Sequence, residues 1–222
     1  MDTLRVEFHC HTIFSKDSLT KPERLVSAAR QKGLQRVVVT DHNSIAGALR
    51  AHQIDPQLII VGEEIMTTRG EILASFVTEE IPAGLTPQET IRRLRDQGAF
   101  ISVSHPFDVQ RRGHWELPDL LEIIPLVDAI ETFNARCMNP AFNLQAQAFA
   151  SKHDLPGTVG SDAHTAMELA RAHLALESFT DADGLRRVLR QGHAHTRLSS
   201  PLIHLTSRFA VTVKKLGFGK YS

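Results

Sequence analysis

The chain has little of what secreted, membrane-spanning and duplex-binding proteins usually carry. Its 222 residues include only two cysteines, Cys10 and Cys137. That is too few for the disulfide framework of a small secreted domain and indicates a reducing compartment. The 25 basic and 25 acidic side chains balance, so no basic footprint for wrapping duplex nucleic acid is present. No apolar run approaches the roughly 20 residues that span a bilayer, and a signal peptide is not apparent. We therefore expect a cytoplasmic protein with no membrane partner.

Short β-rich runs alternate with amphipathic helical stretches, which is typical of an α/β fold with a mostly parallel sheet. Strands are expected over 4–8, 36–40, 58–61, 71–77, 100–104, 128–132 and 158–161, with 172–178 as a further candidate. Helices are expected over 22–32, about 44–52, 86–98, 117–123, 140–153 and 181–191. No repeat, low-complexity run or linker divides the chain. We expect one domain over 1–205, followed by a basic tail over 206–222 whose end, 214–221, is expected to be loosely held.

Histidines and acids follow most of the expected strands. His9 and His11 follow the first strand, His105 follows the fifth, and Asp162 and His164 follow the seventh. In parallel strand-helix folds, the carboxyl ends of the strands form one face that carries the functional groups. These side chains should therefore lie close together.

Two of these groups have the spacing of a metal-binding pair. Residues i and i+2 of an extended chain point to the same side, so His9 and His11 can bind one metal while Cys10 faces the core. Asp162 and His164 repeat this geometry, and Gly160 beside them permits close backbone approach. Alone, a His-x-His motif is as often a core or surface pair. The joint occurrence favours a metal site.

On these motifs the chain resembles the PHP family, the polymerase and histidinol phosphatase superfamily of metal-dependent phosphoesterases. The matching segments run in order along residues 4 to 200: His9-Cys10-His11-Thr12 with Ser15-Lys16-Asp17, Thr40-Asp41-His42, Gly62-Glu63-Glu64-Ile65, Ser104-His105-Pro106 and Gly160-Ser161-Asp162-Ala163-His164. The resemblance implies a single α/β domain shaped as a distorted seven-stranded barrel.

The resemblance also implies two or three divalent metal ions. It places His9, His11, Glu64 and Asp162 around a first ion, with Glu64 bridging to a second. It assigns Asp17, His42 and His164 to a third ion. The second ion would take His105 and a residue after Glu64, where many members have a histidine and this chain has Glu71. Glu71 is the substitute ligand that we expect.

Several imidazole ligands favour Zn, Mn or Fe over Mg or Ca. Three such ions would leave a positive cavity that attracts phosphate. A water that bridges two of them would be acidified toward a pKa of roughly 7. We therefore expect hydroxide attack on a phosphomonoester or phosphodiester. The resemblance makes Glu64, Asp162 and His164 the catalytic residues. The substrate would be a nucleotide, a short oligonucleotide or a small phosphorylated metabolite.

Three arginines in the expected loops, Arg111, Arg112 and Arg136, could hold a phosphate with two parallel hydrogen bonds, although surface arginine is the commoner outcome. Asp41 and Glu131 are expected to orient metal-bound histidines. An alternative function is a metal-stabilised regulatory or binding PHP domain without activity. A metal-dependent amide hydrolase is less consistent with the motif order.

Overall fold

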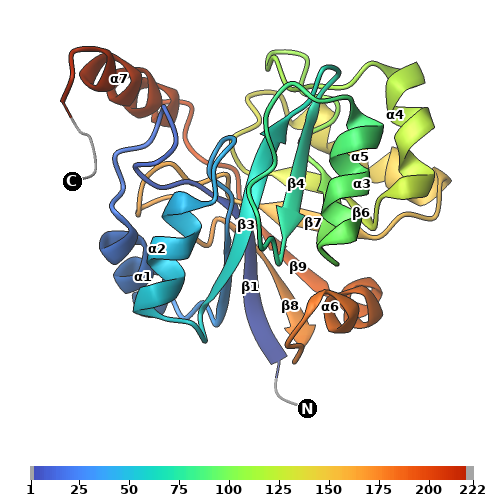
Figure 1. The fold of residues 1–222 in the computed structure, drawn as a ribbon, viewed down its shortest axis with the longest axis horizontal. Helices are drawn as coiled ribbons and strands as arrows, with labels where there is room; N and C mark the ends of the chain where they lie inside the picture. The colour runs from blue at the N-terminus through green and yellow to red at the C-terminus, as the bar shows by residue number, and fades with distance from the viewer. Residues whose placement is uncertain (1–2, 219–222) are drawn as a thin grey trace.

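The computed structural model describes residues 3–218. Strands and helices alternate along most of the chain (Figure 1). The strands are β1 (Thr3–Cys10), β2 (Arg36–Val39), β3 (Ile59–Met66), β4 (Glu71–Ser75), β5 (Phe100–Val103), β6 (Ala129–Asn134), β7 (Gly157–Gly160), β8 (Ala172–Glu177) and β9 (His193–Thr196). The α-helices are α1 (Pro22–Gln31), α2 (Ala46–Ile54), α3 (Pro87–Asp96), α4 (Leu117–Ile123), α5 (Pro140–Lys152), α6 (Ala182–Val188) and α7 (Ile203–Lys215). Short 3-10 helices over Ile124–Leu126 and Leu189–Gln191 follow α4 and α6.

All the strands belong to one sheet, in the order β7-β6-β5-β4-β3-β2-β1-β8-β9. Neighbours are parallel from β1 to β3 and from β5 to β7, whereas β4 runs antiparallel to both β3 and β5. The sheet curls so that β7 approaches β1. Just beyond the ends of these two strands, the backbone amide of His11 donates to the carbonyl of Ala163 at 2.8 Å. The first seven strands thus form the barrel-like α/β fold that was predicted.

The expected elements agree well with the structure up to residue 191, but two later elements were missed. Strands β8 and β9 extend the sheet antiparallel from β1, so the sheet has nine strands and not seven. Helix α7 occupies 206–215 of the segment predicted as a basic tail, and the expectation of a loosely held end is wrong for Lys214 and Lys215, which belong to this helix. The ammonium group of Lys214 donates hydrogen bonds to the carbonyls of Ile13 and Ser15, contacts that no local pattern reveals. Residues 219–222 of the tail lie outside the described residues.

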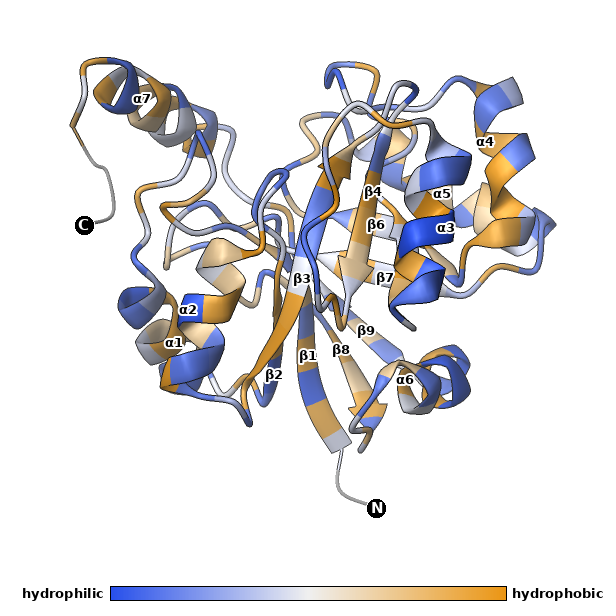
Figure 2. Ribbon diagram, in the orientation of Figure 1, coloured by the Kyte–Doolittle hydropathy of each residue, from blue (hydrophilic) through white to orange (hydrophobic). Residues whose placement is uncertain are grey.

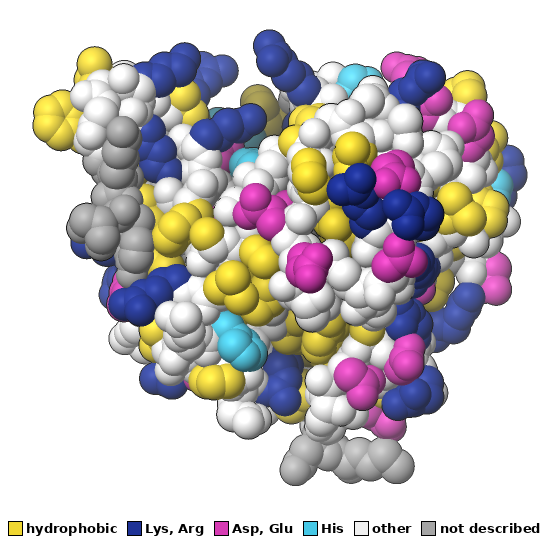
Figure 3. Space-filling view, in the orientation of Figure 1, with side chains coloured by type: hydrophobic (Ala, Val, Ile, Leu, Met, Phe, Trp, Pro, Cys, Tyr) yellow, Lys and Arg dark blue, Asp and Glu magenta, His cyan; other side chains and the backbone are white. Residues whose placement is uncertain are grey.

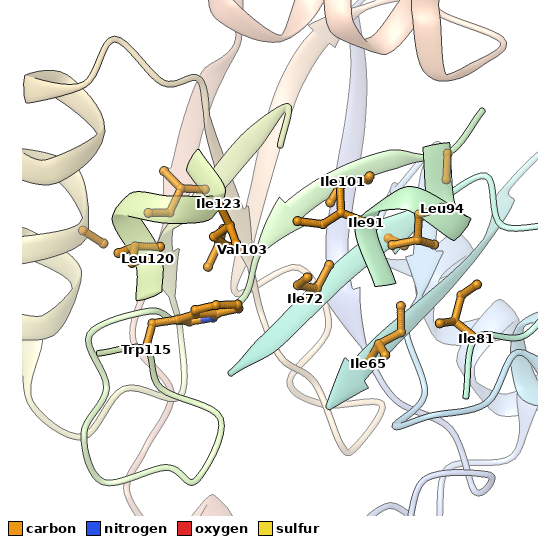
Figure 4. Packing of buried hydrophobic residues seen from close by; sticks show 14 of the residues in the cluster. Ile65, Ile72, Ile81, Ile91, Leu94, Ile101, Val103, Trp115, Leu120 and Ile123 are labelled. Carbon is orange, nitrogen blue, oxygen red and sulfur yellow. The ribbon is translucent and has the colours of Figure 1, made fainter. Parts of the chain in front are cut away.

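Apolar side chains from the strands and helices form three buried clusters. Hydrophobic residues, in orange, recur along the strands and the helices in Figure 2. On the α3 and α4 side, Ile72, Ile101 and Leu94 are fully buried and belong to the same hydrophobic cluster as Trp115 (Figure 4). The indole nitrogen of Trp115 donates to the carbonyl of Glu71 at 3.0 Å. This packing fixes the start of β4, where Glu71 lies. Over residues 3–218, no helix is long and apolar enough to cross a bilayer.

Candidate metal centre

The structure brings all nine predicted metal ligands together at one end of the barrel. Eight of them lie at the carboxyl end of a strand or in the loop that follows. Glu71 instead begins β4, but β4 is antiparallel and its first residue pairs with Met66 at the end of β3. The turn in strand direction therefore places Glu71 at the same end as the others.

Glu64 lies at the centre of the group. Its Oε2 is 3.3 Å from His9 Nε2, 3.4 Å from His11 Nε2 and 3.0 Å from His42 Nδ1. Its Oε1 is 3.1 Å from His105 Nε2. One carboxylate that faces four imidazoles from four different loops and strands is well placed to be shared between metal ions.

A second group lies toward the outside of the site. Asp17 Oδ2 is 3.1 Å from His164 Nε2 and 3.5 Å from His42 Nε2. The rings of His11 and His164 approach within 4.2 Å between centroids, and His11, His42 and His164 can offer nitrogens to one ion. Two further sets with this property are His9 with His11 and Glu64, and His42 with Glu64 and Glu71. The three sets share members and form one continuous centre.

Hydrogen bonds on the far side of the first two histidines fix their tautomers. Glu131 Oε1 lies 2.9 Å from His9 Nδ1, and a carboxylate can only accept there. Ser15 Oγ donates to Asp41 at 2.6 Å, so it accepts from His11 Nδ1 at 3.0 Å. Both Nδ1 atoms carry the proton, and both Nε2 atoms keep a lone pair for a metal. Asp41 thus acts on its histidine through Ser15, and Glu131 acts directly.

The geometry fits a cation better than it fits a hydrogen-bonded core. The Nε2 atoms of His9 and His11 lie 3.1 Å apart, and when both imidazoles are neutral with these tautomers, neither has a proton to donate to the other. Among residues 3–218, the buried Oδ1 atoms of Asp17 and Asp162 have no hydrogen-bond partner, which is rare for buried polar atoms. Divalent ions with nitrogen and carboxylate ligands would satisfy these atoms.

Burial and neighbouring charge also prepare His11 to act as a ligand. Burial lowers its pKa to about 3, and His164 and His42 act in the same direction. The imidazole is therefore neutral at ordinary pH, which is the form that binds a metal.

Carboxylates dominate the field around His9. Burial alone would lower its pKa, but Glu64, Asp162 and Glu131 outweigh burial and raise the pKa well above the usual value. A field that favours a proton at this nitrogen also favours a metal cation. The pKa of Glu71 is also raised, by burial and then by the negative charge of Glu64. A cation between the two carboxylates would relieve that repulsion.

The backbone around the last motif permits this close packing. A Cβ atom on Gly160 would lie 2.4 Å from both His9 Cβ and Glu131 Oε1, so only glycine fits, as the sequence indicated. His105 and Asp162 adopt φ angles of 21° and 50°, a left-handed conformation that costs side-chain-bearing residues energy and often occurs at functional sites.

The three candidate phosphate-binding arginines have different positions. Arg111 Nη1 contacts Asp162 Oδ2 at 2.6 Å, and Arg136 Nε is 3.4 Å from Glu168 Oε1. Both line a cavity of about 830 Å³ that also borders Asp17, His42 and His164. Arg112 is exposed and does not line this cavity, so a role for it as a phosphate ligand stays a prediction. Adjacent loop residues point in different directions, and sequence spacing cannot tell which one turns inward.

Arg111 also affects the charge of Asp162. Burial would raise the pKa of this carboxyl, but Arg111 and His9 outweigh burial and hold the pKa well below its usual range. Asp162 is therefore ionised in the centre.

Helix α7 supplies a wall of the cavity that the sequence analysis missed. His204, Ser207 and Arg208 line the cavity beside Leu205 and Val211. The three-and-four spacing of these residues is typical of one helix face and is the signal that could have identified the wall.

Comparison with known proteins agrees with this geometry. An uncharacterised protein of Methanocaldococcus jannaschii is 36% identical over 174 residues, which cover 77% of this chain and 70% of that protein. The PHP domain model matches residues 7–78, and the PHP-associated model matches 140–194. The chain belongs to the PHP family.

Solved structures share the PHP fold of this chain. PsfC from Pseudomonas syringae has a TM-score of 0.69 at 19% identity, covering 96% of this chain and 100% of PsfC. A protein of Bifidobacterium adolescentis, proposed to be a metal-dependent phosphoesterase, has a TM-score of 0.62 at 20% identity, covering 85% of this chain and 96% of that protein. The two PHP models include every predicted ligand except His105, which lies between them. Its place beside Glu64 comes from the fold.

Proposed function

We propose that the chain is a metal-dependent phosphoesterase that cleaves a phosphomonoester or phosphodiester. The observation that carries the proposal is Glu64, which belongs to two of three overlapping sets of possible metal-binding side chains, while the third set shares His11 and His42 with them. Arginine side chains border the adjoining cavity, and the guanidinium group pairs well with phosphoryl oxygens. A purely structural metal site would be closed by its protein ligands. This centre instead opens to a cavity through Asp17, His42 and His164.

The residues of the chain have distinct roles in this proposal. His9, His11, Glu64 and Asp162 would hold one ion, Glu64, Glu71 and His105 a second, and Asp17, His42 and His164 a third. Divalent ions bound there would polarise phosphoryl oxygens and acidify water, supplying a nucleophile at neutral pH. Glu131 and the Ser15–Asp41 pair keep the histidine nitrogens free for binding. Arg111 orients Asp162 through Nη1 and would offer the remaining N–H groups of its two terminal nitrogens to the phosphoryl group.

The family and the PHP-fold neighbours support a hydrolase of this kind, since the Bifidobacterium adolescentis protein is proposed to be a metal-dependent phosphoesterase. We propose Zn, Mn or Fe because the centre is rich in imidazole. The substrate that we propose is a nucleotide, a short oligonucleotide or a small phosphorylated metabolite.

Metal content and turnover together test the proposal. Protein loaded with Mn, Zn or Fe should hydrolyse a generic aryl phosphate, and a chelator should abolish this activity. His9→Ala and Asp162→Ala should each lose metal and at least about a hundredfold in kcat/KM, with circular dichroism unchanged. Glu122→Gln, an exposed change on α4, is the control. Metal-replete protein that is inert toward a broad panel of phosphoesters would favour the alternative of a non-catalytic PHP domain.

A further inference from the structure

Helix α7 presents a continuous face to the cavity. His204, Ser207, Arg208 and Val211 all line it. From the first to the last of these positions an α-helix rises by about 10 Å. None of the nine predicted ligands comes from α7. The helix therefore faces the part of a bound molecule that projects away from the metal centre.

Specific contacts hold α7 in this position. Arg136 Nη2 donates to Ser207 Oγ at 2.8 Å, and His204 Nε2 lies 3.2 Å from the carbonyl oxygen of Arg136. Lys214, farther along the helix, donates to the carbonyls of the loop that carries Asp17. The cavity face of α7 is thus fixed relative to the metal centre at both ends.

The arginines around the cavity differ in how their charge is balanced. Arg111 contacts the carboxylates of Asp162 and Asp108, and Arg136 contacts Glu168. The guanidinium of Arg208 is exposed, and within residues 3–218 it has no hydrogen bond or ion pair to another side chain. Lys and Arg side chains gather around the hollow beside α7 (Figure 3). Arg208 is the cavity arginine whose charge is not already matched by a carboxylate.

Apolar surface lies next to this cation. Met138 and Leu205 are 57% and 58% exposed and line the same cavity. Exposed apolar side chains inside a concave site favour an organic group over bulk water. The wall therefore combines an apolar surface with an unpaired positive charge.

We propose that Arg208 binds a second anionic group of the substrate, so that α7 selects phosphoesters whose leaving group is apolar and carries an additional negative charge. This inference rests on the proposed function, because it takes the scissile phosphoryl group to bind at the metal centre. The second anion is a phosphate or a carboxylate, since a guanidinium binds both in the same way.

Binding of matched phosphonates tests the proposal without requiring turnover. The ligands are aryl phosphonates whose ring carries either a carboxymethyl group or an ethyl group, at each ring position in turn. Affinity is measured by calorimetry with the full-length, Mn-loaded protein. The wild type should bind the best carboxymethyl compound about five- to tenfold more tightly than its ethyl counterpart. The preference should fall as the salt concentration rises.

Variants test whether the preference for the carboxymethyl compound depends on Arg208 itself or on any positive charge of α7. Arg208→Gln should bring the ratio of the two affinities close to one, and Arg208→Lys should keep part of the preference. Lys215→Gln removes one charge from the same helix at a residue that does not line the cavity and should retain the wild-type ratio. Equal binding of the pair by the wild type at every ring position, or an unchanged ratio in Arg208→Gln, would overturn the proposal.

The corresponding phosphate esters separate this proposal from the proposed function. If the phosphonates show the Arg208-dependent preference but no ester is hydrolysed with any metal, the phosphoesterase proposal fails and the Arg208 site stands. If both esters are hydrolysed with equal kcat/KM and the phosphonates bind equally, the phosphoesterase proposal stands and the Arg208 site is refuted.

Discussion

At the scale of single residues, Glu131 determines which nitrogen of His9 faces the metal centre. Its Oε1 accepts from His9 Nδ1, while its Oε2 accepts from the His105 amide at 2.9 Å and from Asn134 Nδ2 at 3.1 Å. In Glu131→Gln, the two N–H donors that face Oε2 would hold the amide oxygen of the glutamine in that position. The amide nitrogen would then face His9 Nδ1 and force the proton to Nε2.

We therefore expect Glu131→Gln to weaken metal binding about 10- to 100-fold, the usual effect of losing such a partner. Competition with a fluorescent chelator measures this affinity, and unchanged far-ultraviolet circular dichroism would show that the fold persists. The exposed Glu122→Gln provides a change of the same kind away from the centre. Wild-type metal affinity in Glu131→Gln would show that His9 binds through a different tautomer.

The sequence predicted the grouping of the histidines and acids better than it predicted the arginines. His9 and His11 are held by strand geometry, and the alternation of side chains in a strand is visible in a sequence. Arg111 and Arg112 lie in a loop, where direction depends on contacts such as that between Arg111 and Asp162. Such a contact joins residues 51 positions apart and leaves no local signal.

At the scale of secondary-structure elements, α3 shows why most helices could be predicted. Thr86 accepts from the Glu89 amide at 3.2 Å and caps the helix at the position that the sequence indicated. Thr86→Ala should lower the free energy of unfolding by about 1 kcal/mol, while Thr86→Ser should retain it. Urea denaturation measures this difference. Since α3 carries no metal-site residue, metal content should be unchanged. A loss of metal in Thr86→Ala would mean that the helix supports the centre.

Helix α7 lacks a capping residue like Thr86, which explains why its start was missed. It has no side-chain cap at its first turn, and Ala210 is its one fully buried residue. Its position depends on bonds from Arg136 to Ser207 and from Lys214 to the loop after β1. These partners become neighbours only when the barrel has closed.

At the scale of the whole molecule, Asp128 joins parts of the chain that are distant in sequence. It accepts from Arg95 of α3 at 2.7 Å, from Arg186 of α6 at 3.0 Å and from the Ile101 amide of β5 at 2.8 Å. Burial would raise the pKa of its carboxyl, but these hydrogen bonds outweigh burial and lower it. The charged carboxylate therefore connects two outer helices to the sheet.

The lowered pKa predicts how Asp128 contributes to stability as pH changes. A carboxyl with a lower pKa in the folded state stabilises fully above its unfolded pKa of about 4, and this contribution disappears as pH falls through the folded value. Asp128→Asn should cost about 2 kcal/mol near neutral pH, and the gap to wild type should narrow below about pH 4. Urea denaturation across this range, with chelator present to remove metal effects, measures the gap. Asp96→Asn, which removes an exposed ion pair with Arg92, should change stability little at any pH. If the difference in unfolding free energy between wild type and Asp128→Asn stays constant down to low pH, the negative charge of Asp128 contributes nothing to stability.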